Sequence, residues 1–239
     1  MNSIPFNFDE MTKVQWMGIT ILEPVTVITN LLITTVCLFA FLKIHRIPKA
    51  TQIQLLFKYF FLFMALATAT GGILGHGFLY ITGIYGKLPG WYISMFAIAF
   101  IERAAIIHSR PLMPAYWGKF FSILNYVEVV TFLILVYKTL NFHFVELHAT
   151  YGLFIVVFSF ELYTYIKTKD RGARYIFGAT LLAAVAAISN LLKISPHRWF
   201  NYNDVSHVIM VGSIYLYYLG CMHLKMYEDQ PERKVPVLQ

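Results

Sequence analysis

Long apolar stretches alternate along the chain with short breaks that contain charged, glycine or proline residues. Each stretch has about the 20 residues that an α-helix needs to cross the hydrocarbon layer of a membrane. The breaks contain strong helix-ending signals, as at Arg110-Pro111 and in the charged run Lys167–Arg171. The pattern predicts seven spanning helices, at about 20–43, 53–78, 91–109, 117–138, 142–166, 173–193 and 202–226.

The composition agrees with this pattern. Of the 239 residues, 58% are hydrophobic and 13% are charged, whereas soluble domains average about 25% charged residues. Seven spans and their loops use nearly the whole chain, so we expect one all-α domain over residues 1–239, an integral, multi-pass membrane protein. The net charge of +7 then indicates loop charge that sets topology, and we expect no nucleic-acid partner.

Lysine and arginine predict the orientation of the bundle, because cytoplasmic loops carry an excess of these residues. Twelve of them fall in the loops after the first, third and fifth spans or in the C-terminal tail, and five fall on the opposite side. We therefore expect a cytoplasmic C-terminus and an N-terminus on the other side of the membrane, called the outer side below.

Three polar clusters then lie near the outer ends of their helices. They are the segment Glu23–Asn30 in the first span, His76 at the end of the second, and Asn203–His207 at the start of the seventh. An ionisable side chain at the centre of a bilayer costs roughly 2.5–3.5 kcal/mol on insertion scales. Polar groups gathered at one depth from distant parts of the chain indicate a functional site.

The residue types in these clusters suit a metal centre. Asp204 and His207 are spaced i, i+3 and so share one helical face. Joined by His76 from another helix, they could bind a divalent metal with one open position, and imidazole with carboxylate suits zinc. Zinc lowers the pKa of its bound water and polarises a carbonyl. Glu23 and Asp204 are the candidate catalytic acids, and Glu23 could take the proton from that water.

Further polar residues could support this site or serve only the bundle. Asn30, Asn203 and His148 are candidates for holding substrate or for structural hydrogen bonds. The alternative for the whole constellation is that these residues satisfy one another between helices, as buried Asn, Ser, Thr and His often do. Glu128 falls near mid-membrane and must be paired or protonated, whereas Glu102 suggests an ion pair with a neighbouring helix.

At these positions the sequence resembles the CREST superfamily of membrane hydrolases, which includes alkaline ceramidases and progestin and adipoQ receptors. The segment from Glu23 to Asn30 is similar to the family's E-x6-N pattern, His76 matches its second-span histidine, and Asn203 to His207 match its H-x-x-x-H pair. The resemblance implies a zinc ion on three histidines, near a serine and an aspartate, that hydrolyses amides or esters of membrane lipids.

The sequence departs from that family at three positions. Asn203 replaces the first histidine of the pair, Gly72 stands where the family has serine, and Lys87 lies near its aspartate position. Three functions therefore stay open: a zinc-dependent hydrolase of membrane lipids, a lipid or small-molecule receptor on the same bundle, and a haem-binding electron carrier that uses paired histidines. The sequence specifies no protein partner.

Overall fold

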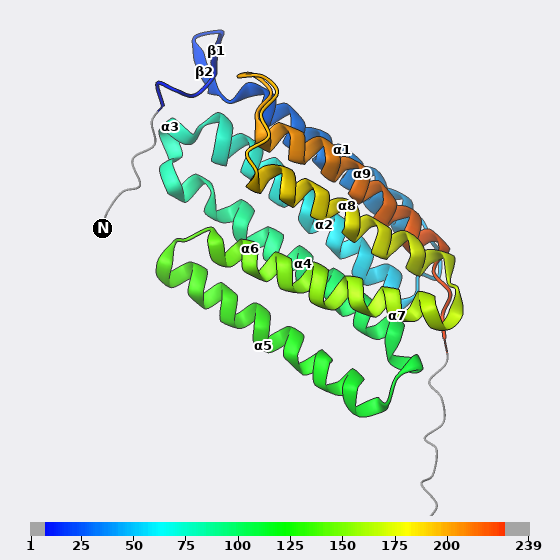
Figure 1. Cartoon of the computed structure of the whole chain (residues 1–239). Coiled ribbons are helices and arrows are strands. Elements are labelled where there is room, and N and C mark those ends of the chain that lie inside the picture. Colours follow the sequence, from blue (N-terminus) through cyan, green and yellow to red (C-terminus); the bar gives the residue numbers. More distant parts are fainter. Residues whose placement is uncertain (1–7, 228–239) are drawn as a thin grey trace, which may run out of the picture.

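The computed structural model describes residues 8–227 and is all-α apart from one short hairpin (Figure 1). The hairpin pairs β1 (Lys13–Trp16) with β2 (Ile19–Leu22) in antiparallel register. The remaining elements are α1 (Pro24–His45), α2 (Gln52–Gly72), the π-helix η1 (Ile73–Gly77), α3 (Leu79–Thr82), the 3₁₀-helix η2 (Gly83–Gly86), α4 (Leu88–Ser109), the 3₁₀-helix η3 (Arg110–Leu112), α5 (Ala115–Thr139), α6 (His143–Thr150), the π-helix η4 (Tyr151–Phe158), α7 (Ser159–Thr168), α8 (Arg171–Leu191) and α9 (Tyr202–His223).

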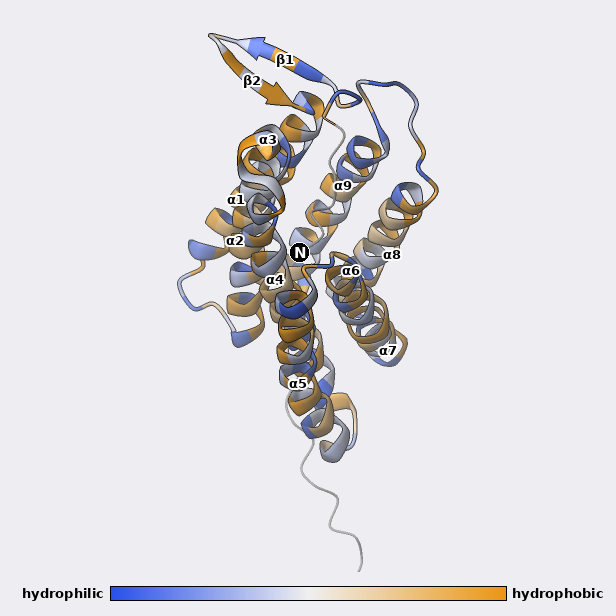
Figure 2. Cartoon of the chain, turned by 90° about the vertical axis from the view of Figure 1, so that its left-hand side faces the viewer, coloured by the Kyte–Doolittle hydropathy of each residue, from blue (hydrophilic) through white to orange (hydrophobic). Residues whose placement is uncertain are grey.

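Seven helical segments are long and apolar enough to cross a membrane, which confirms the predicted fold class at this level. Each predicted span has its helix, and the ends agree to within four residues. The second span continues from α2 through η1, and the fifth is built from α6, η4 and α7 in succession. Figure 2 shows apolar residues along all of these helices, hydrophilic residues in the loops, and both kinds in the hairpin, where β2 is mainly apolar.

Six of the spans form a closed ring, in which each helix packs on the next. The order is α1, α2, α4, the fifth span, α8 and α9, which packs back on α1. The span α5 lies outside this ring along one edge of the molecule and packs on α4 and α6 (Figure 1). Large apolar side chains such as Ile123, Tyr126 and Ile134 are exposed on α5, as expected of a surface that faces lipid.

Aromatic rings and small side chains fill the ring of helices. Phe57, Phe60, Phe61 and Tyr217 are buried against one another at its centre. Between α8 and α9 the contact is made by small residues, and a side chain at Gly220 would collide with Ile176. Close packing of this kind holds helices together in lipid, where the hydrophobic effect gives them no mutual attraction.

The hairpin is the main element that the hydrophobic pattern did not predict. Met17 and Gly18, with φ of 49° and 80°, form its two-residue turn, the positive-φ geometry that suits a tight hairpin. The apolar residues of β2 were assigned to the first span, which in fact begins at Pro24. Proline fits the first helical position because the amide it lacks would have no partner there.

Candidate functional site

The start of α1, the π-helix η1 and the start of α9 meet, so the three segments that the sequence predicted to lie at the outer side come together. The Glu23 carboxylate Oε2 lies 2.8 Å from Nδ1 of His76. From α9, Nδ1 of His207 lies 3.0 Å from the hydroxyl of Thr29 on α1. The first two turns of α1 therefore lie near all three residues that were predicted to be neighbours, which are Glu23, His76 and His207.

Glu23 and His76 form a half-buried pair. Their side chains are 15% and 21% exposed. A carboxylate that accepts the Nδ1–H of His76 leaves the lone pair of Nε2 free, and Nε2 has no hydrogen-bond partner among residues 8–227. Burial raises the pKa of Glu23, but the hydrogen bond and charge of His76, then the charges of Lys87 and His207, outweigh it and lower the pKa overall. Glu23 is therefore ionised and holds the imidazole in an orientation suited to proton transfer.

The backbone places Glu23 in an unusual conformation. It has φ 42° and ψ 53°, in the left-handed region, and precedes Pro24 at the start of α1. Its N–H donates to the carbonyl of Thr12 at 2.8 Å, beside the hairpin. Such conformations cost about 1–3 kcal/mol and persist only where neighbouring structure enforces them. The hairpin thus fixes the direction in which the Glu23 carboxylate leaves the chain.

Both carboxylate oxygens of Asp204 accept hydrogen bonds from other parts of the bundle. Its Oδ1 accepts from the hydroxyls of Thr26 at 2.8 Å and Thr29 at 3.4 Å, while its Oδ2 accepts from the N–H of Asn201 at 2.7 Å. The last bond belongs to a capping box at the start of α9. Asp204 therefore fastens α9 to α1, and Asn203 accepts a hydrogen bond from Asn190 of α8 at 3.0 Å.

A cavity of about 170 Å³ opens beside the Glu23–His76 pair. Its polar wall includes Asn30, His76 and Lys87, and much of the remaining wall is apolar. Burial lowers the pKa of Lys87, and the Glu23 charge opposes that shift. A cavity with a base and a cation at one side suits the polar end of an amphipathic molecule. The full lining is Asn30, Met64, Ala67, Thr68, Gly71, Gly75, His76, Lys87, Gly90, Trp91, Ser94 and Phe142.

Two glycines of the second span allow the side chains of Asn30 and Lys87 to approach its backbone closely. A Cβ at Gly72 would lie 2.7 Å from the Cβ of Asn30, and one at Gly75 would lie 3.3 Å from Cγ of Lys87. A serine at position 72 would thus displace Asn30. His76 itself lies in the π-helix η1, an irregularity that often marks functional positions in helices.

The structure places potential metal ligands elsewhere than predicted. Among residues 8–227, one set of three His, Cys, Asp or Glu residues has ligand atoms within 4.8 Å of one another, and it is Glu102, Glu128 and His148. His76, His207 and Asp204 do not form such a set. His148 is not at the outer cluster: its Nδ1 lies 2.6 Å from Oε1 of Glu128. The sequence showed that Glu128 needed a partner, but not which helix would supply it.

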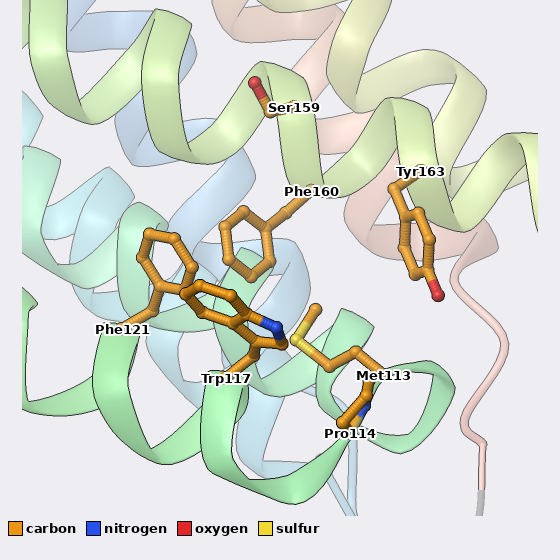
Figure 3. Close-up of a pocket in the computed structure, with 7 residues that line it drawn as sticks. All are labelled: Met113, Pro114, Trp117, Phe121, Ser159, Phe160 and Tyr163. Carbon is orange, nitrogen blue, oxygen red and sulfur yellow. The ribbon is translucent and has the colours of Figure 1, made fainter.

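A second cavity, of about 280 Å³, lies at the opposite end of the bundle between the start of α5 and α7 (Figure 3). Figure 3 shows the rings of Trp117, Phe121 and Phe160 grouped on one side of it. The hydroxyl of Tyr163 donates to the carbonyl of Leu112 at 2.6 Å. Within the described part of the chain, no carboxylate, imidazole or amine lines this cavity, whose wall is mainly apolar.

Comparison with known proteins gives one match. The model of a family described as "Family of unknown function (DUF6962)" matches residues 25–226. No curated protein and no solved structure matches the chain. The match spans the helical bundle, includes His76 and His207, and begins two residues after Glu23.

Proposed function

This chain belongs to the DUF6962 family, and we propose that it is a membrane-embedded hydrolase that cleaves an ester or amide bond of a membrane lipid. One observation carries the proposal: the Glu23–His76 pair, at 2.8 Å, borders a cavity whose polar wall includes Lys87. Carboxylate, imidazole and cation are the groups that general acid–base hydrolysis uses.

The proposed reaction needs only water as its second reactant. Nε2 of His76 takes a proton from water while the water oxygen bonds to the carbonyl carbon of the lipid. The ionised carboxylate of Glu23 stabilises the imidazolium that forms, as a buried acid does in hydrolytic triads. When the tetrahedral intermediate collapses, the bond to the leaving oxygen or nitrogen breaks, and the imidazolium returns its proton to that atom.

Lys87 is placed to bind the carbonyl oxygen as it gains negative charge. It lines the cavity with His76, and a donor preorganised for a developing oxyanion typically lowers a barrier by about 3–4 kcal/mol. The side-chain amide of Asn30, which also lines the cavity, already donates to the carbonyl of Thr26 at 2.9 Å. A cavity of about 170 Å³ is smaller than the 300–1,000 Å³ typical of pockets for drug-sized ligands. A cavity of this size suits the ester or amide bond of the lipid and part of its headgroup, while the acyl chains remain in the bilayer.

The family resemblance implies zinc, but the donor atoms at the outer cluster do not fit a three-ligand zinc site. His76 and His207 each offer one imidazole, whereas both carboxylate oxygens of Asp204 accept hydrogen bonds. Within residues 8–227 these three do not bring their ligand atoms within 4.8 Å of one another. The proposed reaction therefore has no step that passes through a metal.

The charge pattern supports an orientation in which this cavity lies on the non-cytosolic side of the membrane. Lysines and arginines are concentrated at the other end of the helices, as the cytoplasmic face requires. Part of that count, Arg233 and Lys234, lies outside the described residues. The substrate would then be a lipid of the non-cytosolic leaflet.

The test is hydrolysis by the full-length protein in lipid nanodiscs, offered a panel of ceramides, phospholipids and acylglycerols. We expect the wild-type protein to release a fatty acid and His76→Ala to lose at least 100-fold in rate, the scale of general-base catalysis. His143→Ala is the matched control, because His143 is an exposed histidine at the same end of the bundle. Equal losses in both variants, or no release from any lipid class, would refute the proposal.

A receptor for a small amphipathic molecule is the second candidate, and the hydroxyl groups in the cavity wall favour it. Thr68 donates to the carbonyl of Met64 at 2.9 Å and Ser94 to that of Trp91 at 2.7 Å, so neither hydroxyl is paired with a base. A lipid that co-purifies unchanged and raises the melting temperature of wild-type protein, but not of His76→Ala, would support this function instead.

A further inference from the structure

A second polar cluster lies inside the bundle where α4, α5 and α6 meet. It consists of Glu102, Glu128 and His148, with Asn125 beside them. Glu102 and His148 are fully buried and Glu128 is 8% exposed. It shares no residue with the outer cavity, so its role is independent of the proposed hydrolysis.

Two carboxylate oxygens in this cluster have no hydrogen-bond partner. Oε2 of Glu102 accepts from the side-chain amide of Asn125 at 3.2 Å, but its Oε1 is buried without a partner. Oε1 of Glu128 contacts His148, but its Oε2 is likewise buried and unpartnered. They are the only two such side-chain atoms among residues 8–227. Leaving a buried charged group unsatisfied is costly, so two together indicate a missing cation.

His148 is oriented as a metal ligand usually is. Its Nε2 lies 3.0 Å from the carbonyl oxygen of Met95, and a carbonyl only accepts, so this nitrogen carries the hydrogen. Nδ1 then faces Oε1 of Glu128 at 2.6 Å, a contact that needs a proton between the two atoms when no metal is bound. A metal that displaces this proton would take the lone pair of Nδ1. Metal-bound histidines almost always donate their other N–H to a carbonyl or carboxylate in this way.

The backbone near the cluster makes room for the carboxylate of Glu102. Gly152 lies in the π-helix η4, four residues after His148, and a side chain there would collide with Oε1 of Glu102. Around His76, too, glycines at a π-helix make room for polar side chains: Gly72 for that of Asn30 and Gly75 for that of Lys87. Both π-helices of the chain's described part thus accompany a histidine–glutamate contact.

Charge and donor type select the class of ion. Two carboxylates and a neutral imidazole carry a charge of −2, which a divalent cation neutralises, and neutrality matters for a group buried among helices. One nitrogen and two oxygen donors suit Zn²⁺, Mn²⁺ or Fe²⁺ better than the all-oxygen sites of Ca²⁺ or Mg²⁺. We propose that Glu102, Glu128 and His148 hold one divalent transition-metal ion within the helix bundle.

The experiment is metal analysis of the full-length protein purified in nanodiscs without chelator. We expect about one equivalent of zinc, manganese or iron per chain, and roughly 100-fold weaker binding in Glu102→Gln and Glu128→Gln. Glu161→Gln is the matched control, since Glu161 is an equally buried glutamate that contacts His108 at 3.0 Å but belongs to no three-ligand set.

A cobalt titration of chelator-treated wild-type protein keeps the test independent of whether any variant folds. Bound Co²⁺ with one nitrogen and two oxygen ligands should give visible absorption that saturates at one ion per chain. Wild-type protein that binds none of Zn²⁺, Mn²⁺, Fe²⁺ or Co²⁺ at millimolar concentration would overturn the proposal. So would an equal loss of metal in Glu161→Gln, because that residue is outside the cluster.

Discussion

Glu23 combines three properties that a sequence displays only in part. It ends the hairpin, it holds a left-handed backbone conformation with φ 42°, and its carboxylate lies 2.8 Å from His76. The sequence predicted that this acid and this histidine would meet, because both fall at the outer ends of adjacent spans. It did not predict the strained backbone, since nothing in the local pattern calls for a positive φ at a glutamate.

Replacement of Glu23 by glutamine tests its part in the reaction. Glutamine keeps the size of the side chain but cannot stabilise an imidazolium by charge, so we expect turnover to fall by roughly 100-fold with little change in the Michaelis constant. Steady-state kinetics on the lipid that wild-type protein cleaves gives both quantities. A rise in the Michaelis constant alone would instead assign Glu23 to substrate binding.

Adjacent glycines offer a direct test of the packing beneath the cavity. Gly72→Ala should lower the free energy of unfolding by about 1–3 kcal/mol, the usual effect of overpacking, because its Cβ would lie 2.7 Å from Asn30. Gly71→Ala should not destabilise the protein, since no heavy atom lies within 4 Å of a Cβ there. Thermal unfolding in detergent compares the two, and equal destabilisation would contradict the described contact of α1 with the second span.

Among the elements, the start of α8 is a junction at the end of the bundle opposite the cavity. Asp170 caps α8 by accepting from the N–H groups of Gly172 and Ala173. Its Oδ2 also accepts from the N–H of Lys225 at 3.0 Å and the hydroxyl of Tyr227 at 2.9 Å. One carboxylate thus joins the helix start to the chain after α9.

The stability of this junction should depend on pH. Burial raises the pKa of Asp170, but hydrogen bonds from His108, Lys225 and Tyr227 outweigh it and lower the pKa from 3.8 to about 2. Because the folded pKa is depressed, the stabilisation is complete above the unfolded value and is lost as pH falls from about 4 towards 2.

Asp170→Asn should therefore cost about 2 kcal/mol at neutral pH and should flatten the acid dependence of unfolding. Asp9→Asn is the control, because the side chain of Asp9 is 98% exposed. Unfolding curves recorded from pH 7 to pH 2 measure both effects. An acid profile unchanged by Asp170→Asn would show that the junction does not depend on this carboxylate.

Viewed as a whole, the molecule shows which features a hydrophobic pattern can predict. The seven spans follow from apolar length, and the shared depth of Glu23, His76 and His207 follows from their positions at the ends of those spans. Neighbour relations around the ring do not follow, because apolar helices of similar length can pack in many orders. His148 was therefore assigned to the outer cluster, although the structure pairs it with Glu128 across α5 and α6.

The same reasoning explains Asp204. Its i, i+3 spacing from His207 correctly indicates a nearby face, but the carboxylate turns to the hydroxyls of Thr26 and Thr29 on α1. Threonines in an apolar span gave no sign of that role. A buried acid near a helix start is as well suited to capping as to metal binding, and only the arrangement of α1 beside α9 decides between them.

Hydrolysis in ¹⁸O-labelled water tests the central claim most directly. Purified wild-type protein in nanodiscs is incubated with the lipid panel, and mass spectrometry measures the label in free fatty acid. The account predicts one ¹⁸O atom in each acid released, with label formation abolished in His76→Ala and retained in His143→Ala. If folded wild-type protein leaves every lipid intact and releases no labelled fatty acid, the account is contradicted.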